Sequence, residues 1–438
     1  MSGMADCLET QSADPSGVPF AELDPALLRT QRTSLKWTRF PEDTLPLFVA
    51  EMDFAVAPEI RRTLVERIEA SDLGYLDGPG PLAGAFADFA RDRWGWEVPH
   101  ERIHLATDVA TGVVESLRVL APNGTRVVVP TPVYPGFFEM LEELPFEIAE
   151  VPLTTGSASD GHAPAGLDLA AIEREFAAGA DVFLLCNPHN PHGIAYTRDE
   201  LTELARLAAA HGVAVVSDEI HAPLTHSGVT FTPFAPLAAA AGALSVTTIS
   251  ASKGWNIAGT KCAVIVAADD RANRVLADLP PETVTRASIL GLHASVAAFN
   301  DGRDWLDRAV AQIEANVSLL AELVPAELPG VHLAVPRAGY LAWLDLRDAG
   351  LGDDPYTRVL EDAKVALNNG AFFGAAGAGH VRLNLACAPD TIREAVRRIA
   401  SILPARTPGP TEPSSGAPSS TAPAPTTPAS TAALTQEA

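Results

Sequence analysis

Short apolar runs alternate with helix-like segments through the middle of the chain. Four runs have the length and composition of buried strands: residues 125–130, 181–186, 213–219 and 244–250. Apolar residues at helical spacing mark residues 57–71, and Thr197 and Glu200 have the spacing of a capping box that starts a helix. Because strands that alternate with helices favour parallel pairing, we predict an α/β fold with a large, doubly wound and mostly parallel sheet.

The pattern changes toward the C-terminus, where longer helical segments enclose a few strand-like ones. Residues 303–324 and 389–403 have helical spacing, and the segments 332–335 and 339–346 between them are strand-like. These elements predict a second, smaller α/β domain in this part of the chain.

Five parts of the chain follow from these patterns. They are a flexible arm (1–17), an N-terminal segment that packs on the small domain (18–56), a large domain (57–289), a small C-terminal domain (290–403) and a disordered tail (404–438). The tail is rich in Pro, Ser, Thr and Ala and has almost no large apolar residue, so it cannot bury a core.

Acidic residues outnumber basic ones, 55 to 31, which gives the chain a net charge of −24. Such a charge repels phosphate backbones, so we expect no nucleic-acid partner. No apolar run reaches the length of a membrane span, and the first residues lack the basic start and apolar stretch of a secretory signal. We therefore expect a cytoplasmic protein with no membrane partner.

Cysteine and lysine are both scarce. The four cysteines lie far apart and show no C-x-x-C spacing, so neither a metal site nor a disulfide framework is predicted. The four lysines are Lys36, Lys253, Lys261 and Lys364. Chemistry that requires a lysine amine therefore has few candidates, and we expect Lys36, beside a tryptophan, to be a surface or packing residue.

Polar or Gly/Pro-rich residues follow three of the predicted strands, at the edge where ligands bind in open α/β sheets. The three segments are 187–193 (Asn-Pro-His-Asn-Pro-His-Gly), 217–221 (Ser-Asp-Glu-Ile-His) and 250–254 (Ser-Ala-Ser-Lys-Gly). Each segment alone is weak evidence, because Asn-Pro turns and Asp helix caps are common. Their joint presence at three strand ends predicts a shared site.

The chemistry that uses these groups together is that of pyridoxal phosphate. Its aldehyde needs a lysine amine, which Lys253 supplies, and its pyridine nitrogen needs a carboxylate partner such as Asp218 to stay protonated. The ring hydroxyl needs a neutral donor, and the Asn190 amide provides one. The phosphate needs hydroxyls, backbone N–H groups and a cation. Its candidate ligands are Ser250, Ser252 and Lys261.

The order and spacing of these motifs resemble those of fold-type I pyridoxal-phosphate enzymes, in the class I/II aminotransferase superfamily. The matching order is Asn-Pro-x-Asn-Pro-x-Gly, then Asp, then Ser-x-Ser-Lys. The resemblance implies that Lys253 forms the Schiff base, that Asp218 pairs with the pyridinium nitrogen and that Asn190 binds the ring hydroxyl. Lys261 stands where many members carry a phosphate-binding arginine.

Further matches extend over about residues 32–403. The resemblance implies that Tyr134 stacks on the cofactor ring and that the backbone amides of Val109 and Ala110 bind the phosphate. Asp108 departs from the glycine that is usual at its position. An acid beside a phosphate is unfavourable, so this departure puts the geometry of the phosphate loop in doubt.

Two more matches concern the substrate and a second subunit. Arg382 matches the arginine that binds the substrate α-carboxylate. Tyr75 matches a tyrosine that reaches the phosphate from the partner subunit. The resemblance therefore implies an amino-acid substrate and a homodimer with shared active sites.

Three segments are similar to the cystathionine β-lyase/cystalysin-like carbon–sulfur lyase branch: 32–54, 218–221 and 382–389. The second segment places His221 where many transaminases carry a tyrosine. This branch implies α,β-elimination of L-cystathionine or a related S-substituted L-cysteine to a thiol, pyruvate and ammonia. In that reaction Lys253 removes the Cα proton, and the leaving thiolate is protonated by Lys253 or Tyr134.

Several alternatives stay open at this point. An aminotransferase of the same fold needs the same cofactor residues and differs in requiring a keto acid. A regulatory protein-binding role suits the acidic surface, although Lys253 and Arg382 argue against a non-catalytic protein. His221 either touches the cofactor or is a buried structural histidine. Asp53 and Tyr340 are considered as residues that face the substrate, but neither receives an assigned role.

Overall fold

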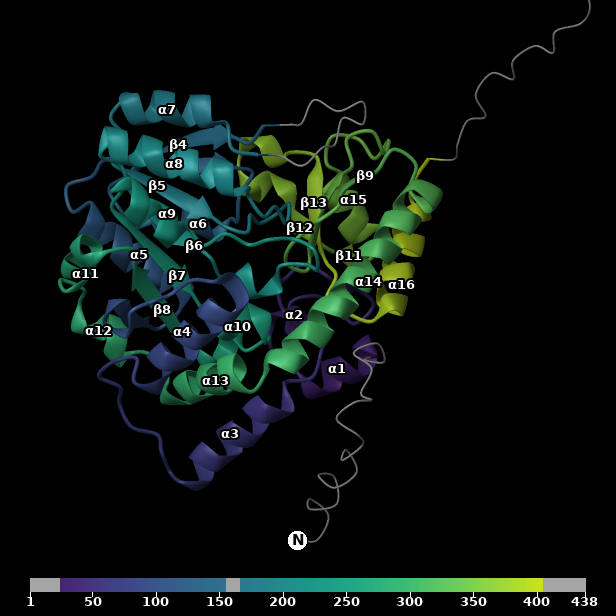
Figure 1. Ribbon diagram of the computed structural model, residues 1–438. Helices are drawn as coiled ribbons and strands as arrows, with labels where there is room; N and C mark the ends of the chain where they lie inside the picture. The colour runs from purple at the N-terminus through teal and green to yellow at the C-terminus, as the bar shows by residue number, and fades with distance from the viewer. Residues whose placement is uncertain (1–23, 155–165, 405–438) are drawn as a thin grey trace, which may run out of the picture. The chain divides into compact units, whose positions relative to one another are not determined.

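The strand and helix signals of the sequence become two main sheets with helices packed around them, as a computed structural model of the chain shows (Figure 1). The structure describes residues 24–154 and 166–404. The predicted arm (1–17) and all but the first residue of the predicted tail (404–438) therefore lie outside the described residues.

Within these ranges, seven strands form the larger sheet, in the order β2-β8-β7-β6-β5-β3-β4. The strands are β2 (Ile103–Ala106), β3 (Arg126–Thr131), β4 (Glu147–Pro152), β5 (Val182–Cys186), β6 (Ala214–Asp218), β7 (Ser245–Ile249) and β8 (Ala263–Ala267). Neighbours pair in parallel from β4 to β7, whereas β8 is antiparallel to both β7 and β2. The predicted large and mostly parallel sheet is confirmed.

Helices cover both faces of this sheet. One face carries α5 (Val109–Leu120), α6 (Gly136–Glu142) and α11 (Asp270–Leu276). The other carries α4 (Pro81–Trp94), α7 (Leu169–Ala177), α8 (Arg198–His211), α9 (Phe234–Ala241) and α13 (Ile289–Asn300). In β5, Leu184 and Cys186 pack toward α5, whereas Phe183 and Leu185 belong to the core on the opposite face. Because both faces are buried, the strand reads as an unbroken apolar run.

Helix α8 begins as the sequence predicts. The Thr197 hydroxyl accepts the backbone N–H of Glu200, and the Glu200 carboxylate accepts the backbone N–H of Thr197. This reciprocal pair satisfies two donors that a helix start otherwise leaves without partners. The remaining helices beside the larger sheet are α3 (Pro58–Glu69), α10 (Ala251–Gly254) and α12 (Pro281–Thr285).

The C-terminal part of the described chain forms a smaller sheet in the order β12-β13-β10-β9, and all its pairs are antiparallel. Its strands are β9 (His332–Ala334), β10 (Leu341–Asp345), β12 (Asn368–Asn369) and β13 (His380–Asn384). The helices here are α14 (Arg303–Glu327), α15 (Pro355–Glu361) and α16 (Pro389–Ala400). The helices α14 and α16 and the strands β9 and β10 lie where the sequence predicts helices and strands, whereas α15, β12 and β13 were not predicted.

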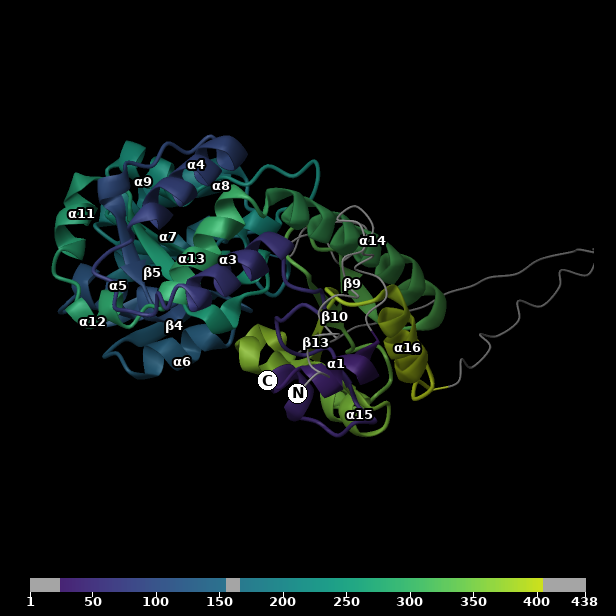
Figure 2. The same ribbon diagram turned by 90° about the horizontal axis from the view of Figure 1, so that it is seen from below.

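The N-terminal segment joins this smaller part through backbone pairing. It contains α1 (Pro25–Gln31), α2 (Leu35–Thr38) and β1 (Leu45–Pro46), and β1 pairs in parallel with β11 (Val365–Ala366). The Arg398 guanidinium of α16 donates to the carbonyl oxygens of Asp43 and Lys364, at 2.7 and 3.2 Å. Figure 2 shows α1 beside the elements of the smaller sheet. The exact domain boundaries stay a prediction.

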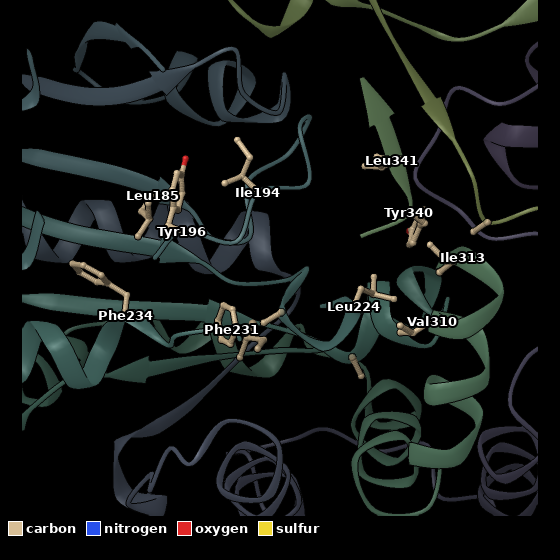
Figure 3. Close-up of a cluster of buried hydrophobic side chains, with 14 of the residues drawn as sticks. Leu185, Ile194, Tyr196, Leu224, Phe231, Phe234, Val310, Ile313, Tyr340 and Leu341 are labelled. Atoms are coloured by element: carbon tan, nitrogen blue, oxygen red, sulfur yellow. The ribbon is translucent and has the colours of Figure 1, made fainter. Parts of the chain in front are cut away.

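One hydrophobic cluster extends from the larger sheet to the smaller one (Figure 3). Leu185 lies on the side of the larger sheet, and Tyr340 and Leu341 lie at β10 of the smaller sheet. Val310 and Ile313 of α14 belong to the same cluster and lie on its Tyr340 side. Because the two sheets share one core, strand ends from both can contribute to one site. In the described part of the chain, no helix is long and apolar enough to cross a membrane.

Candidate functional site

Residues that follow five strands of the larger sheet line a single cavity. They lie after β2 (Asp108), β3 (Tyr134), β5 (Asn190), β6 (Asp218) and β7 (Lys253). These strands all point the same way, so their carboxyl ends meet at one edge of the sheet. The site residues predicted from sequence line this cavity, with the exceptions of Arg382 and Tyr75. Besides Tyr134, Asn190, Asp218 and Lys253, the predicted residues in the cavity wall are Val109, Ala110, His221, Ser250, Ser252 and Lys261.

Lys253 lies in the short helix α10, directly after β7. Its Nζ donates a hydrogen bond to the carbonyl oxygen of Ala50 at 2.9 Å. Burial and, to a smaller extent, the positive charge of Arg382 together lower the pKa of Lys253 to about 8, although Asp218 opposes the shift. The amine therefore loses its proton far more readily than a lysine in water, which makes it a better nucleophile and base.

Asp218 is the last residue of β6. Its Oδ1 accepts the backbone N–H of Ile220 at 3.0 Å. Burial raises the pKa of this carboxyl to about 7, even though the hydrogen bond from Ile220 and the charge of Lys253 oppose the rise. A buried carboxyl without a strong cationic partner favours a ligand that brings a positively charged N–H group to it.

Arg382 lies on β13 of the smaller sheet and is only 3% exposed. Its guanidinium donates to the Oδ1 atoms of Asn190 and Asn368, at 2.9 and 2.6 Å, and more weakly to the carbonyl oxygen of Phe48. Among the described residues, no carboxylate lies within ion-pair distance of it, and its Nε has no hydrogen-bond partner. Burial lowers the pKa of Arg382 to about 10. A buried cation of this kind is a site for an anionic ligand.

Asn190 gains a defined orientation from this contact. Its Oδ1 is taken by Arg382, so its Nδ2 remains as the donor. Both side chains thereby link the cavity at the end of β5 to the smaller sheet. This contact joins two residues 192 positions apart in sequence.

Tyr134 forms one wall of the cavity and is 38% exposed. A Cβ atom at position 136 would lie 2.3 Å from its ring, so Gly136 is required for the ring to lie against the start of α6. The neighbouring Pro132 carbonyl is held by His189 Nε2 at 2.7 Å, and the other ring nitrogen of His189 contacts the Tyr196 hydroxyl at 2.9 Å. His189 therefore has a structural role beneath this wall.

The predicted phosphate ligands lie together, although the side chains of two of them, Ser250 and Lys261, already have hydrogen-bond partners. The Ser250 hydroxyl donates to the Cys262 carbonyl oxygen at 2.6 Å and accepts the backbone N–H of Ser252. Val109 and Ala110 open α5, where backbone N–H groups have no partner within the helix. The first turn of α5 therefore places backbone N–H donors at the cavity, at the two residues that the family resemblance implies as phosphate ligands.

His221 and Tyr75 have contrasting environments. The His221 ring is buried in the cavity wall, and in the described part of the chain its Nδ1 has no hydrogen-bond partner. Burial lowers the pKa of His221 to about 3, so the ring is neutral. Tyr75 is 95% exposed and does not line the cavity of its own chain.

Sequence reasoning missed the backbone that closes the cavity. The Ala50 carbonyl oxygen accepts both the Lys253 amine and the Tyr340 hydroxyl, at 2.9 and 3.0 Å. A backbone carbonyl leaves no mark in a sequence, because every residue has one. Asn368, which also contacts Arg382, was missed because it lies beside Asn369 in a mostly apolar segment and belongs to no motif that the sequence analysis recognised.

A buried ion pair supports this backbone segment. Lys36 is fully buried, and its Nζ donates to the Asp53 carboxylate and to the Glu51 carbonyl oxygen. Asn256 and Asn384 also hold the segment through its backbone groups. Of the two roles expected for Lys36, a surface or a packing residue, the structure shows the second: the side chain is buried in the core, and Asp53 compensates its charge.

Comparison with known proteins places the chain in a family. Residues 43–399 match the family model described as aminotransferase class I and II. The cystathionine beta-lyase of Corynebacterium glutamicum is 35% identical over 387 residues, which cover 88% of this chain and 100% of that protein. The cystathionine beta-lyase PatB of Bacillus subtilis is 34% identical over 378 residues, with 84% and 96% covered.

A solved structure agrees with these relatives. A chain from Corynebacterium diphtheriae, described as a PLP-dependent beta-cystathionase, is 36% identical and superposes with a TM-score of 0.81. The alignment covers 86% of this chain and 97% of that one. The chain belongs to the class I and II aminotransferase family, as its strand-end motifs predicted.

Proposed function

We propose that the chain is a pyridoxal-phosphate-dependent carbon–sulfur β-lyase. It splits L-cystathionine or a related S-substituted L-cysteine into a thiol, pyruvate and ammonia. The observation that carries the proposal is one site that combines a buried amine, a buried carboxyl and a buried guanidinium without a carboxylate partner among the described residues: Lys253, Asp218 and Arg382. The relatives named cystathionine beta-lyase support the lyase reaction over other reactions of the family.

The residues present fit pyridoxal phosphate. The cavity has an amine for an aldehyde, a carboxyl for a ring nitrogen and a free amide donor for a ring oxygen, and the unpartnered His221 Nδ1 lies among them. Lys253, Asp218 and Asn190 would hold these three groups, with Tyr134 against the ring. When bound, the cofactor withdraws electrons from the substrate Cα and so acidifies its proton.

The chain's own groups account for the remaining requirements. Arg382 binds the substrate α-carboxylate as a fork, because its charge is buried and has no internal anion. The Lys253 amine takes the Cα proton, and the bond between Cβ and sulfur then breaks. The departing thiolate receives a proton from Lys253 or Tyr134. Addition of one water balances the release of thiol, pyruvate and ammonia, so no keto acid is consumed.

A homodimer with shared sites is part of the proposal. Tyr75 is almost fully exposed, and it follows a helix, α3, that presents Val65 and Ile68 to solvent. An apolar face of this kind, next to an exposed tyrosine, suits contact with a second copy of the chain. A cytoplasmic location stays a prediction.

The test uses the purified, cofactor-loaded protein and L-cystathionine without any keto acid. Thiol and pyruvate are assayed together, with an S-alkyl cysteine as a second substrate and L-alanine, which has no leaving group, as the control. We expect thiol and pyruvate in equal amounts from the first two and neither from alanine. If neither product forms, and an amino group moves only after a keto acid is added, the chain is an aminotransferase instead.

A further inference from the structure

Asp108 and Lys261 form an ion pair at the rim of the cavity. The Lys261 ammonium donates to Asp108 Oδ2 at 2.8 Å, and both residues line the same cavity as Lys253. Lys261 has a φ of 56°, in the left-handed region that residues other than glycine rarely adopt. The backbone conformation of Lys261 is therefore held by its surroundings, which place the amine against Asp108.

The second oxygen of Asp108 is used at the start of α5. Asp108 is the N-cap of that helix, and its Oδ1 accepts the backbone N–H of Thr111 at 2.8 Å. Burial opposes ionisation, but the hydrogen bonds from Lys261 and Thr111 hold the pKa of Asp108 below its ordinary value. A full negative charge therefore lies where the first-turn amides of Val109 and Ala110 face the cavity.

This charge matters for a phosphate ligand. A phosphate monoester carries about two negative charges at neutral pH. A helix N-terminus and a lysine both attract such a group. Here the lysine charge is already neutralised by Asp108, so the pair offers the phosphate no net positive charge.

We propose that Asp108 lowers the affinity of the site for pyridoxal phosphate, by holding Lys261 and by repelling the phosphate. The phosphate and Asp108 share one lysine, and the cofactor consequently exchanges with solution faster than it would without the Asp108 charge. The inference rests on the cofactor assignment of the proposed function, but not on which reaction the cofactor supports.

The variant Asp108→Asn removes the negative charge of Asp108 and leaves the fold intact. Asparagine keeps an oxygen that caps α5, so the helix start is preserved. The readout is the rate at which pyridoxal phosphate leaves the holoenzyme after dilution into a trapping aldehyde reagent, together with its dissociation constant. We expect the dissociation constant to fall about tenfold, from the removal of one charge near the phosphate.

The chain offers a matched control. Asp269 caps α11 through the backbone N–H of Ala272 at 2.8 Å, and it does not line the cavity. Asp269→Asn should leave cofactor release unchanged. Pyridoxal, which lacks the phosphate, should bind wild type and Asp108→Asn with dissociation constants that differ less than about twofold.

A second variant tests whether the two residues act together. Lys261→Met should raise the dissociation constant about tenfold, and Asp108→Asn should have a different effect in that background than in the wild type. Unchanged or weaker binding of pyridoxal phosphate by Asp108→Asn, with normal thermal stability, overturns this inference but not the proposed function. Failure of the wild type to take up any pyridoxal phosphate overturns both this inference and the proposed function.

Discussion

Burial changes the pKa values of three side chains that line the cavity. It raises the pKa of Asp218 to about 7, and it lowers that of Lys253 to about 8 and that of His221 to about 3. The largest cause of all three shifts is the removal of water from around charged groups. The site therefore combines the Asp218 carboxyl, which titrates near neutral pH, with the Lys253 amine, which can lose its proton, and the neutral His221 imidazole.

The variant Asp218→Asn tests this account through stability. Because burial raises the pKa of Asp218 from 3.8 to about 7, the cofactor-free wild type gains a buried negative charge as pH rises through that window. The folded state binds more protons than the unfolded state there, so the free energy of unfolding of the wild type falls relative to the variant. We expect the melting temperature of the variant minus that of the wild type to rise between pH 4 and pH 7 and then level off.

Thermal unfolding of both apo-proteins across this range checks the prediction. Glu219, the neighbouring buried acid, is present in both proteins, so its own titration largely cancels in the difference. A difference that stays flat or shrinks with rising pH would show that Asp218 titrates as an ordinary exposed carboxyl.

The sequence predicted the strands of the larger sheet best where both faces of a strand are buried. The strands β3, β5, β6 and β7 are almost fully buried, and polar residues of the site lie at or directly after the end of each. The strand β8 is an unbroken apolar run, but such a run carries no direction, so its antiparallel pairing could not be predicted from the sequence. The segment 49–54 was not predicted as a cavity wall, because its contribution is a backbone carbonyl held by side chains distant in sequence.

The buried ion pair of Lys36 and Asp53 supports the segment 49–54 and leads to a prediction about stability. In Lys36→Met the Asp53 carboxylate stays buried without its partner, and loss of one member of such a pair costs about 3–5 kcal/mol. We expect the free energy of unfolding in urea to fall by about that amount. Combining Lys36→Met with Asp53→Leu should recover much of the loss, because no buried charge then remains.

An exposed pair provides the comparison. Arg358 and Asp362 form an ion pair on α15, with both side chains about half exposed. Arg358→Ala should therefore change the free energy of unfolding by no more than about 1 kcal/mol. Equal losses of unfolding free energy in Lys36→Met and Arg358→Ala would show that the buried pair contributes no more to stability than an exposed pair.

At the scale of the whole molecule, the site depends on contacts that no local pattern encodes. Arg382 of the smaller sheet reaches Asn190, which follows β5 of the larger sheet, and one hydrophobic core joins the two sheets (Figure 3). The motifs identified these residues separately, and the resemblance supplied their roles. Their meeting point follows only from the packing of the two sheets.

The proposed shared sites of a homodimer lead to a complementation prediction. Tyr75→Ala removes the residue offered to the partner, whereas Lys253→Ala keeps Tyr75 and removes the amine. When the two inactive variants are refolded together, half of the dimers are mixed and each mixed dimer has one complete site, so about a quarter of wild-type activity should return. Pyruvate release from L-cystathionine measures it. Activity no higher than the sum of the separate variants would place each site within one chain.

The central claim is that the cavity around Lys253 carries out elimination on a sulfur-substituted amino acid. The most direct measurement is the initial rate of pyruvate release from L-cystathionine, without keto acid, by cofactor-loaded wild type and by Lys253→Ala. We expect release by the wild type and a loss of at least about 10³-fold in the variant, because the nucleophile and the base are removed together. Turnover by Lys253→Ala close to that of the wild type would contradict the account.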